Sequence, residues 1–138
     1  MKILKVVTKK KREVVDITDL VEQGIGDSRL INLFVKHTTA ALTVADLDPG
    51  TDLDMLDAFE AMIPAHVVGE ARPDLSGRPK LNYRHPHDPK HVPDHILSAL
   101  VGVSLTLPVK DGRLDLGAWQ RVVLMEFDGP RSREVVIF

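Results

Sequence analysis

The chain has 138 residues, the size of one domain, and its 43% hydrophobic and 28% charged residues are the ordinary composition of a globular protein, so we predict a single domain over residues 1–138. Lys and Arg number 18 against 20 Asp and Glu, and this balance, together with few aromatic residues, leads us to expect no nucleic-acid partner. The lack of cysteine excludes disulfides and thiolate chemistry. We find no signal peptide and no apolar run near the ~18 residues that a membrane helix needs, so we expect a cytoplasmic protein with no membrane partner.

The first third of the chain predicts four strands. Residues 1–7 and 13–17 are rich in Val and Ile, and the basic run at 9–12 between them predicts the turn of a hairpin. Residues 19–26 contain two glycines and predict a short helical turn or loop. Residues 29–35 predict a strand that we expect to be buried on both faces, and residues 41–45 predict another short strand.

A helix is predicted over residues 51–63, between a turn at 48–50 and Pro64. Thr51 precedes Asp54 at the spacing of a capping box, which predicts the start of this helix. Apolar residues then recur at helical spacing, and we expect them to be core residues. They are Leu53, Met55, Leu56, Phe59, Met62 and Ile63.

Residues 66–92 show no periodicity and hold four of the six histidines, and a loop of this length is usually functional or disordered. A short helix is predicted from Pro93 to about Val101, with Gly102 after its end. Strands are predicted at 103–109, 113–116, 121–127 and 134–138, with a hairpin turn at 110–112. About eight strands and two helices, joined by hairpins, predict an α+β fold with a mainly antiparallel, barrel-like sheet sandwich.

His37, Thr38 and Thr39 directly follow an apolar strand, and the end of a strand holds side chains rigidly enough to build a site. The hydroxyl and backbone N–H groups of the two threonines could bind an anion. The alternative is a polar turn whose side chains only satisfy the backbone.

The histidine cluster predicts a metal site. His85 and His87 would lie on one side of an extended segment, and His91 and His95 follow closely. Neutral imidazole is a common ligand of zinc, copper and nickel, so two or three of these residues with His37 could form an open metal site. The alternative is a set of exposed loop histidines.

Glu126 and Arg131 flank a turn at the end of an apolar run. Burial would raise the pKa of Glu126 unless it meets a cation or a metal, and a raised pKa would suit a general base. The alternative is an ion pair with Arg131 or Arg133. Arg131 could bind a phosphate through two hydrogen bonds. Since no phosphate-binding loop or dinucleotide motif is present, we expect no nucleotide or flavin cofactor.

Three motifs together resemble the YjbQ family, from about residue 10 to the C-terminus. They are HTTA at 37–40, followed by Leu42-Thr43, SLTLPVKDGRLDLGAWQ at 104–120, and EFDGPR at 126–131. The sequence departs from the family pattern at two places. The family usually has an Asn-Glu pair shortly after the HTTA motif, and here the nearest acidic residue is Asp46. Met125 stands where the family often has a cysteine. The family carries the label secondary thiamine-phosphate synthase.

The resemblance implies an α+β homotrimer with histidine-lined sites near the subunit contacts. It also implies a weak capacity to join the thiamine pyrimidine diphosphate to the thiazole phosphate. We therefore expect an enzyme acting on phosphorylated small molecules, with a divalent metal such as zinc or magnesium. The alternative is a trimeric protein that binds a metal or a phosphorylated metabolite without turnover. The assigned residues are His37, His85 and His95 as catalytic and metal-binding, Glu126 as base or fourth metal ligand, and Thr38, Thr39 and Arg131 as phosphate-binding.

Overall fold

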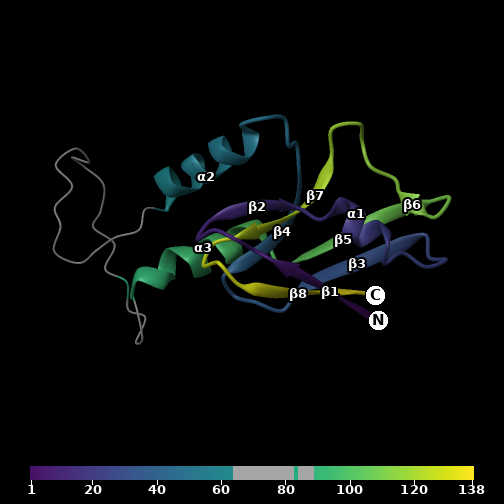
Figure 1. Cartoon of the computed structure of the whole chain (residues 1–138), viewed down its shortest axis with the longest axis horizontal. Helices are drawn as coiled ribbons and strands as arrows, with labels where there is room; N and C mark the ends of the chain where they lie inside the picture. The colour runs from purple at the N-terminus through teal and green to yellow at the C-terminus, as the bar shows by residue number, and fades with distance from the viewer. Residues whose placement is uncertain (64–82, 84–88) are drawn as a thin grey trace.

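The structure is a computed structural model and describes residues 1–63, 83 and 89–138 (Figure 1). The strands in this part of the chain are β1 (Lys2–Val7), β2 (Glu13–Asp16), β3 (Leu30–Val35), β4 (Ala40–Ala45), β5 (Ser104–Lys110), β6 (Arg113–Leu114), β7 (Arg121–Glu126) and β8 (Ser132–Ile137). The helices are α1 (Thr18–Glu22), α2 (Thr51–Met62) and α3 (Val92–Val101), and a 3-10 turn at Pro89–His91 precedes α3. None of these helices has the length and hydropathy needed to cross a membrane.

All strand pairs in the described residues are antiparallel, and they form two sheets. The larger sheet has the order β1-β8-β3-β5-β6, and the smaller has the order β2-β7-β4. The predicted α+β fold with a mainly antiparallel sheet is confirmed. The structure has one more α-helix than the two predicted, because the helical turn expected near residue 19 forms α1.

The layers follow from the alternation of side chains along each strand. The inner faces of the two sheets enclose the main core, with Leu33, Leu42 and Leu124 fully buried in it. The other face of the smaller sheet packs against α2 and α3, where the rings of Phe59 and Phe127 meet edge to face at 6.0 Å. The molecule is therefore a stack of a sheet, a second sheet and a helical layer (Figure 1).

The hairpin predicted between the first two strands is wrong, because β1 pairs with β8 and β2 pairs with β7. Val7 lies opposite Ser132 in the larger sheet, and six residues further along Glu13 lies opposite Glu126 in the smaller sheet. The two chain segments thus keep one register while they cross between the sheets. They form a single bent ribbon, and the basic run at 9–12 lies in its bend.

Backbone hydrogen bonds continue through this bend. The N–H of Thr8 donates to the carbonyl of Arg131 at 2.9 Å, and the N–H of Gly129 donates to the carbonyl of Lys11 at 2.9 Å. The bend therefore fixes the connection between β7 and β8 against the connection between β1 and β2.

β3 is buried on one face only, which corrects the expectation of a strand buried on both. Ile31, Leu33 and Val35 are buried, whereas Leu30 and Phe34 are 58% and 41% exposed. The helical layer lies on the smaller sheet, so the outer face of the larger sheet carries no described helix.

α2 differs from its prediction in two ways. The N-cap is Gly50, at a positive φ of 94°, and no side chain caps the helix, so the predicted capping box does not form. No residue of α2 is fully buried, and Leu53 and Met62 are 57% and 62% exposed. Met55 and Phe59 make its partly buried contacts with the smaller sheet.

Candidate functional site

An open cleft of about 740 Å³ lies where the β3–β4 connection, the start of α3 and the β7–β8 connection meet. Its lining residues are Lys36, His37, Thr38, Thr39, His91, His95, Asp128, Pro130, Arg131, Ser132 and Arg133. The cleft therefore brings together residues 37–39, His95 of α3 and Arg131 of the β7–β8 connection, which are far apart in the sequence.

Hydrogen bonds from α3 to residues 38–40 set one wall of the cleft. The hydroxyl of Ser98 donates to the carbonyl of Ala40 at 2.7 Å. Nδ1 of His95 lies 3.1 Å from the carbonyl oxygen of Thr38. Because a carbonyl can only accept, this Nδ1 carries a proton, and the lone pair of neutral His95 is on Nε2.

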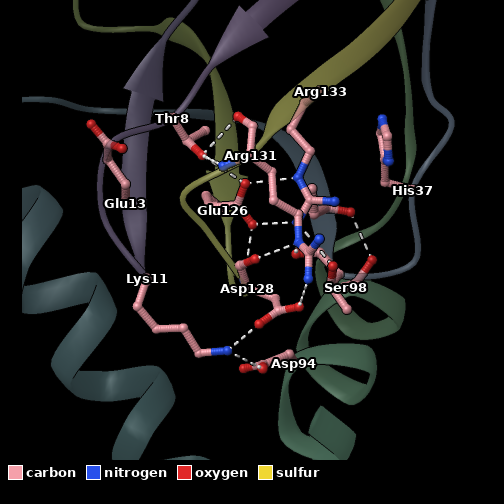
Figure 2. A network of polar contacts seen from close by, with 12 residues as sticks. Thr8, Lys11, Glu13, His37, Asp94, Ser98, Glu126, Asp128, Arg131 and Arg133 are labelled. Carbon is pink, nitrogen blue, oxygen red and sulfur yellow. Dashed lines mark hydrogen bonds and ion pairs between the residues drawn. The ribbon is translucent and has the colours of Figure 1, made fainter.

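Glu126 and Arg133 form a buried ion pair beneath the cleft (Figure 2). Nε of Arg133 donates to one carboxylate oxygen of Glu126 at 2.7 Å, and Nη2 donates to the other at 2.5 Å. The hydroxyl of Thr8 and the N–H of Asp128 complete the shell of Glu126 at 2.9 and 2.8 Å. Burial alone would raise the pKa of Glu126, but the hydrogen bonds, led by that from Arg133, outweigh it and lower the pKa.

This geometry shows which of the two environments considered for Glu126 is present. The alternative of an ion pair is the one that the structure shows, and its partner is Arg133. A carboxylate with a lowered pKa and all its contacts directed at a guanidinium, a hydroxyl and an N–H lacks the raised pKa on which the general-base role depended.

Asp128 is the second carboxylate of the site and holds Arg131. Nη2 of Arg131 donates to Oδ2 of Asp128 at 2.7 Å, and Nε of Arg131 donates to the backbone carbonyl of Asp128 at 2.7 Å. The Lys11 ammonium pairs with Oδ1 of Asp128. Burial alone would raise the pKa of Asp128, but the hydrogen bonds from Lys11 and Arg131 lower it to about 2. The side chain of Arg131 remains 52% exposed and lines the cleft.

His37 is held as a neutral ring. Its Nε2 accepts a hydrogen bond from the N–H of Glu134 at 2.9 Å, so its proton is on Nδ1. Burial lowers the pKa of His37, and the charge of Arg133 lowers it further. His37 therefore offers a hydrogen-bond donor and not a lone pair.

Only two of the three histidines of the predicted metal site, His37 and His95, are among the residues that the structure describes. His85 lies outside them, as do His66 and His87. His37 is not arranged as a ligand, because one ring nitrogen already accepts an N–H and the other is protonated. In the neutral ring of His95 the lone pair is on Nε2, which is the nitrogen through which this residue would bind a metal.

A different group has metal-like spacing. Three potential ligand atoms lie within 4.8 Å of one another: a ring nitrogen of His91 and one carboxylate oxygen each of Asp94 and Asp128. The Lys11 ammonium, however, already pairs with both carboxylates, at 3.1 Å to Asp94, and Arg12 also reaches Asp94 at 3.1 Å. Two side-chain cations thus balance the charge that a metal would neutralise.

Sequence reasoning missed Arg133 as a lining residue, although a signal was present. The alternation of β8 puts Arg133 on the same side as Val135 and Ile137, which are core residues. A charged residue in that series predicts a buried ion pair.

Comparison with known proteins identifies the family. The family model described as UPF0047 protein YjbQ-like matches residues 2–138. The UPF0047 protein of Archaeoglobus fulgidus is 35% identical over 132 residues, covering 94% of this chain and 93% of the relative, and YugU of Bacillus subtilis is 32% identical over 143 residues, covering 99% and 96%. A conserved hypothetical protein of Thermus thermophilus has a crystal structure that is 38% identical and superposes with a TM-score of 0.82 over 100% of this chain and 98% of that one. A second crystal structure, of a family member from Clostridium acetobutylicum, is 26% identical with a TM-score of 0.83 over the same shares of the two chains. The chain therefore belongs to the YjbQ-like UPF0047 family.

Proposed function

We propose that the cleft binds a phosphorylated small molecule and that the protein is an enzyme acting on it. The observation that carries this proposal is the composition of the lining. Among the lining residues that the structure describes, the cations Lys36, Arg131 and Arg133 stand against one carboxylate, Asp128, which is itself paired. Guanidinium groups bind phosphate oxygens through two parallel hydrogen bonds, and three hydroxyl residues in the same lining add further donors.

The reaction that we propose is a secondary activity of the thiamine-phosphate synthase kind, as the family resemblance implies. The bond between the pyrimidine methylene carbon and the diphosphate oxygen breaks, and its electron pair leaves with the diphosphate. The thiazole nitrogen then supplies the electron pair of the new carbon–nitrogen bond. A cleft of fixed cations lowers this barrier by stabilising the charge that develops on the departing diphosphate.

The alternative function is a binding protein without turnover, and one observation favours it. Glu126 and Asp128 are both held as ionised partners of arginines, and His37 is held neutral, so these three residues supply binding groups and no base. For either function we propose a homotrimer, as the resemblance implies, and a divalent cation bound through His95.

The experiment uses untagged protein with inorganic phosphate, with inorganic pyrophosphate, and with the two thiamine precursors. Calorimetry measures binding, and ³¹P NMR follows release of pyrophosphate with and without zinc or magnesium. Arg131→Ala should weaken phosphate binding about tenfold or more, because a charge-assisted contact is lost. Turnover that falls with this variant supports the enzyme, binding without turnover supports the alternative, and absence of anion binding overturns both.

A further inference from the structure

We infer that Arg133 is a second anion-binding arginine of the cleft, and that Arg131 and Arg133 together favour a ligand with two linked phosphate groups over one with a single phosphate. This inference rests on the proposed function of the cleft as a phosphate site. It assigns Glu126 and Asp128 as positioning residues, one for each arginine.

The first step is the hydrogen bonds of Arg133. Nε and Nη2 donate to Glu126, and Nη2 also donates to the hydroxyl of Thr39 at 2.9 Å. Nη1 makes no hydrogen bond with any residue that the structure describes. The side chain is only 3% exposed, yet the described residues contain no buried side-chain nitrogen without a hydrogen-bond partner. Nη1 is therefore the part of Arg133 that solvent reaches, and Arg133 lines the cleft.

The second step is that Arg131 repeats this arrangement. Its Nε and Nη2 donate to the backbone carbonyl and the carboxylate of Asp128, and within the described chain its Nη1 is also without a hydrogen bond. Each guanidinium is thus held along one edge by the chain and keeps N–H groups at the other end. Figure 2 shows both side chains leaving the start of β8 toward the two carboxylates.

The third step is spacing. Arg131 and Arg133 are two residues apart where the chain enters an extended strand, so their side chains leave on the same side, with Cα atoms about 7 Å apart. Two linked phosphate groups can each meet one guanidinium, whereas a single phosphate group has to share its oxygens between both. Because the carboxylates already fix both guanidiniums, little side-chain entropy is lost when the ligand binds.

The test compares inorganic pyrophosphate with inorganic phosphate on the full-length protein by calorimetry. The first variant is Glu126→Leu combined with Arg133→Met, since replacing both members of a buried ion pair with apolar residues of similar size leaves folding largely intact. We expect this double variant to lose about tenfold or more of its pyrophosphate affinity and to keep its phosphate affinity through Arg131. Arg121→Met is the matched control, because Arg121 forms exposed ion pairs with Asp16 and Asp19 and does not line the cleft; its binding should not change.

A second variant covers the case in which the double variant does not fold. Arg133→Lys keeps a positive charge beside Glu126 but loses the second terminal N–H group, so the preference for pyrophosphate over phosphate should fall. A merely structural role of the ion pair would lower the melting temperature in these variants without changing the ratio of the two affinities. A folded variant that retains the parent's ratio overturns the inference and leaves the phosphate site standing. Parent protein that binds neither anion overturns both.

Discussion

Asp128 is the residue on which the charges beside the cleft converge. Its carboxylate pairs with Lys11 and Arg131, and Nδ1 of His91 lies 3.3 Å from it. The folded-state pKa is about 2, below the ordinary value of 3.8. A pKa that is lower in the folded than in the unfolded protein stabilises the fold above the unfolded pKa, and this stabilisation is lost as pH falls through the folded pKa.

We therefore expect the pairing of Asp128 to stabilise the protein above about pH 4 and to stop doing so as pH falls toward about 2. The measurement is the urea midpoint of the parent and of Asp128→Asn across this range. The difference between the two proteins should shrink as the solution becomes more acidic. The titrations of Glu126 and Asp16 are common to both proteins and cancel in the comparison. A difference that stays constant with pH would contradict the prediction.

The Glu126–Arg133 pair gives a prediction on stability. Glu126→Gln leaves a buried guanidinium without its counter-charge, and the loss should be about 3–5 kcal/mol in the free energy of unfolding. The combined Glu126→Leu and Arg133→Met variant should be far closer to the parent, because neither charge then remains buried alone. Denaturant unfolding of both variants tests this. Equal losses would show that the pair contributes by packing and not by charge.

Two of the cleft histidines, His37 and His95, should respond differently to zinc. If zinc binds the native state, the melting temperature rises with free zinc, and the rise fades below about pH 6.5 as imidazoles become protonated. His95→Ala should remove most of this rise, because the lone pair of His95 is on Nε2. His37→Ala should keep it, because the ring of His37 has no lone pair to offer. A rise that survives the first variant and disappears in the second would contradict the assigned ring protonation.

At the residue scale, the sequence predicted which residues line the cleft better than it predicted their protonation states. The HTTA and EFDGPR motifs marked His37 and Arg131 as site residues, and both line the cleft. The sequence offered an ion pair as one alternative for Glu126 but could not decide it, because the pKa depends on whether the guanidinium of Arg133 reaches the carboxylate, and the bend of the ribbon decides that. Ring protonation was equally out of reach, since one backbone N–H at Glu134 fixes it in His37.

The bend of the ribbon is the element on which the cleft depends, and Gly129 is its critical residue. A Cβ at this position would lie 2.2 Å from the carbonyl oxygen of Lys10 and 2.8 Å from Cγ of Glu126. Gly129→Ala should therefore force the two chain segments apart, with a loss of about 1–3 kcal/mol and weaker pyrophosphate binding.

Gly26→Ala is the matched control for that variant, because a Cβ at Gly26 meets no atom within 4 Å. We expect its stability to stay within about 0.5 kcal/mol of the parent. Thermal unfolding and calorimetry of the two variants side by side make the comparison. Equal stability of the two variants would show that the bend tolerates a wider separation of its strands.

At the element scale, the positions of strands and helices could be predicted, and their partners could not. Alternation and turn residues mark β1 and β2, and the pattern is the same whether the two strands pair with each other or with β8 and β7. The turn at 110–112 was predictable because Asp111 and Gly112 both have positive φ, which is a local property. Pairing across more than a hundred residues is a property of the whole fold.

At the scale of the whole molecule, the helices that the structure describes leave the outer face of the larger sheet uncovered. On the larger sheet, Ile3, Val7, Leu30 and Phe34 are 53%, 70%, 58% and 41% exposed. The inward residues of β3 and β8 belong to the core, so only the outward residues can serve a contact between subunits. A contact between subunits through β3 and β8 would therefore use this outer face, on which Leu30 and Phe34 are the exposed apolar residues of β3.

The last prediction is that this face forms the contacts of the proposed homotrimer. Phe34 lies opposite Val136 and Ser104 on its neighbouring strands, so it stands in the interior of the sheet and not at an edge. Phe34→Asp would place a charge in a desolvated contact, and light scattering at micromolar concentration should show it moving from three chain masses toward one. Leu53→Asp is the control: it is 57% exposed, but it lies on α2, beyond the smaller sheet from this face, and it should leave the trimer intact. Circular dichroism must show both variants folded, because Phe34 is only partly exposed. Parent protein at the mass of one 15.3 kDa chain would rule out the trimer, and loss of assembly only in Leu53→Asp would move the contact from the sheet to the helical layer.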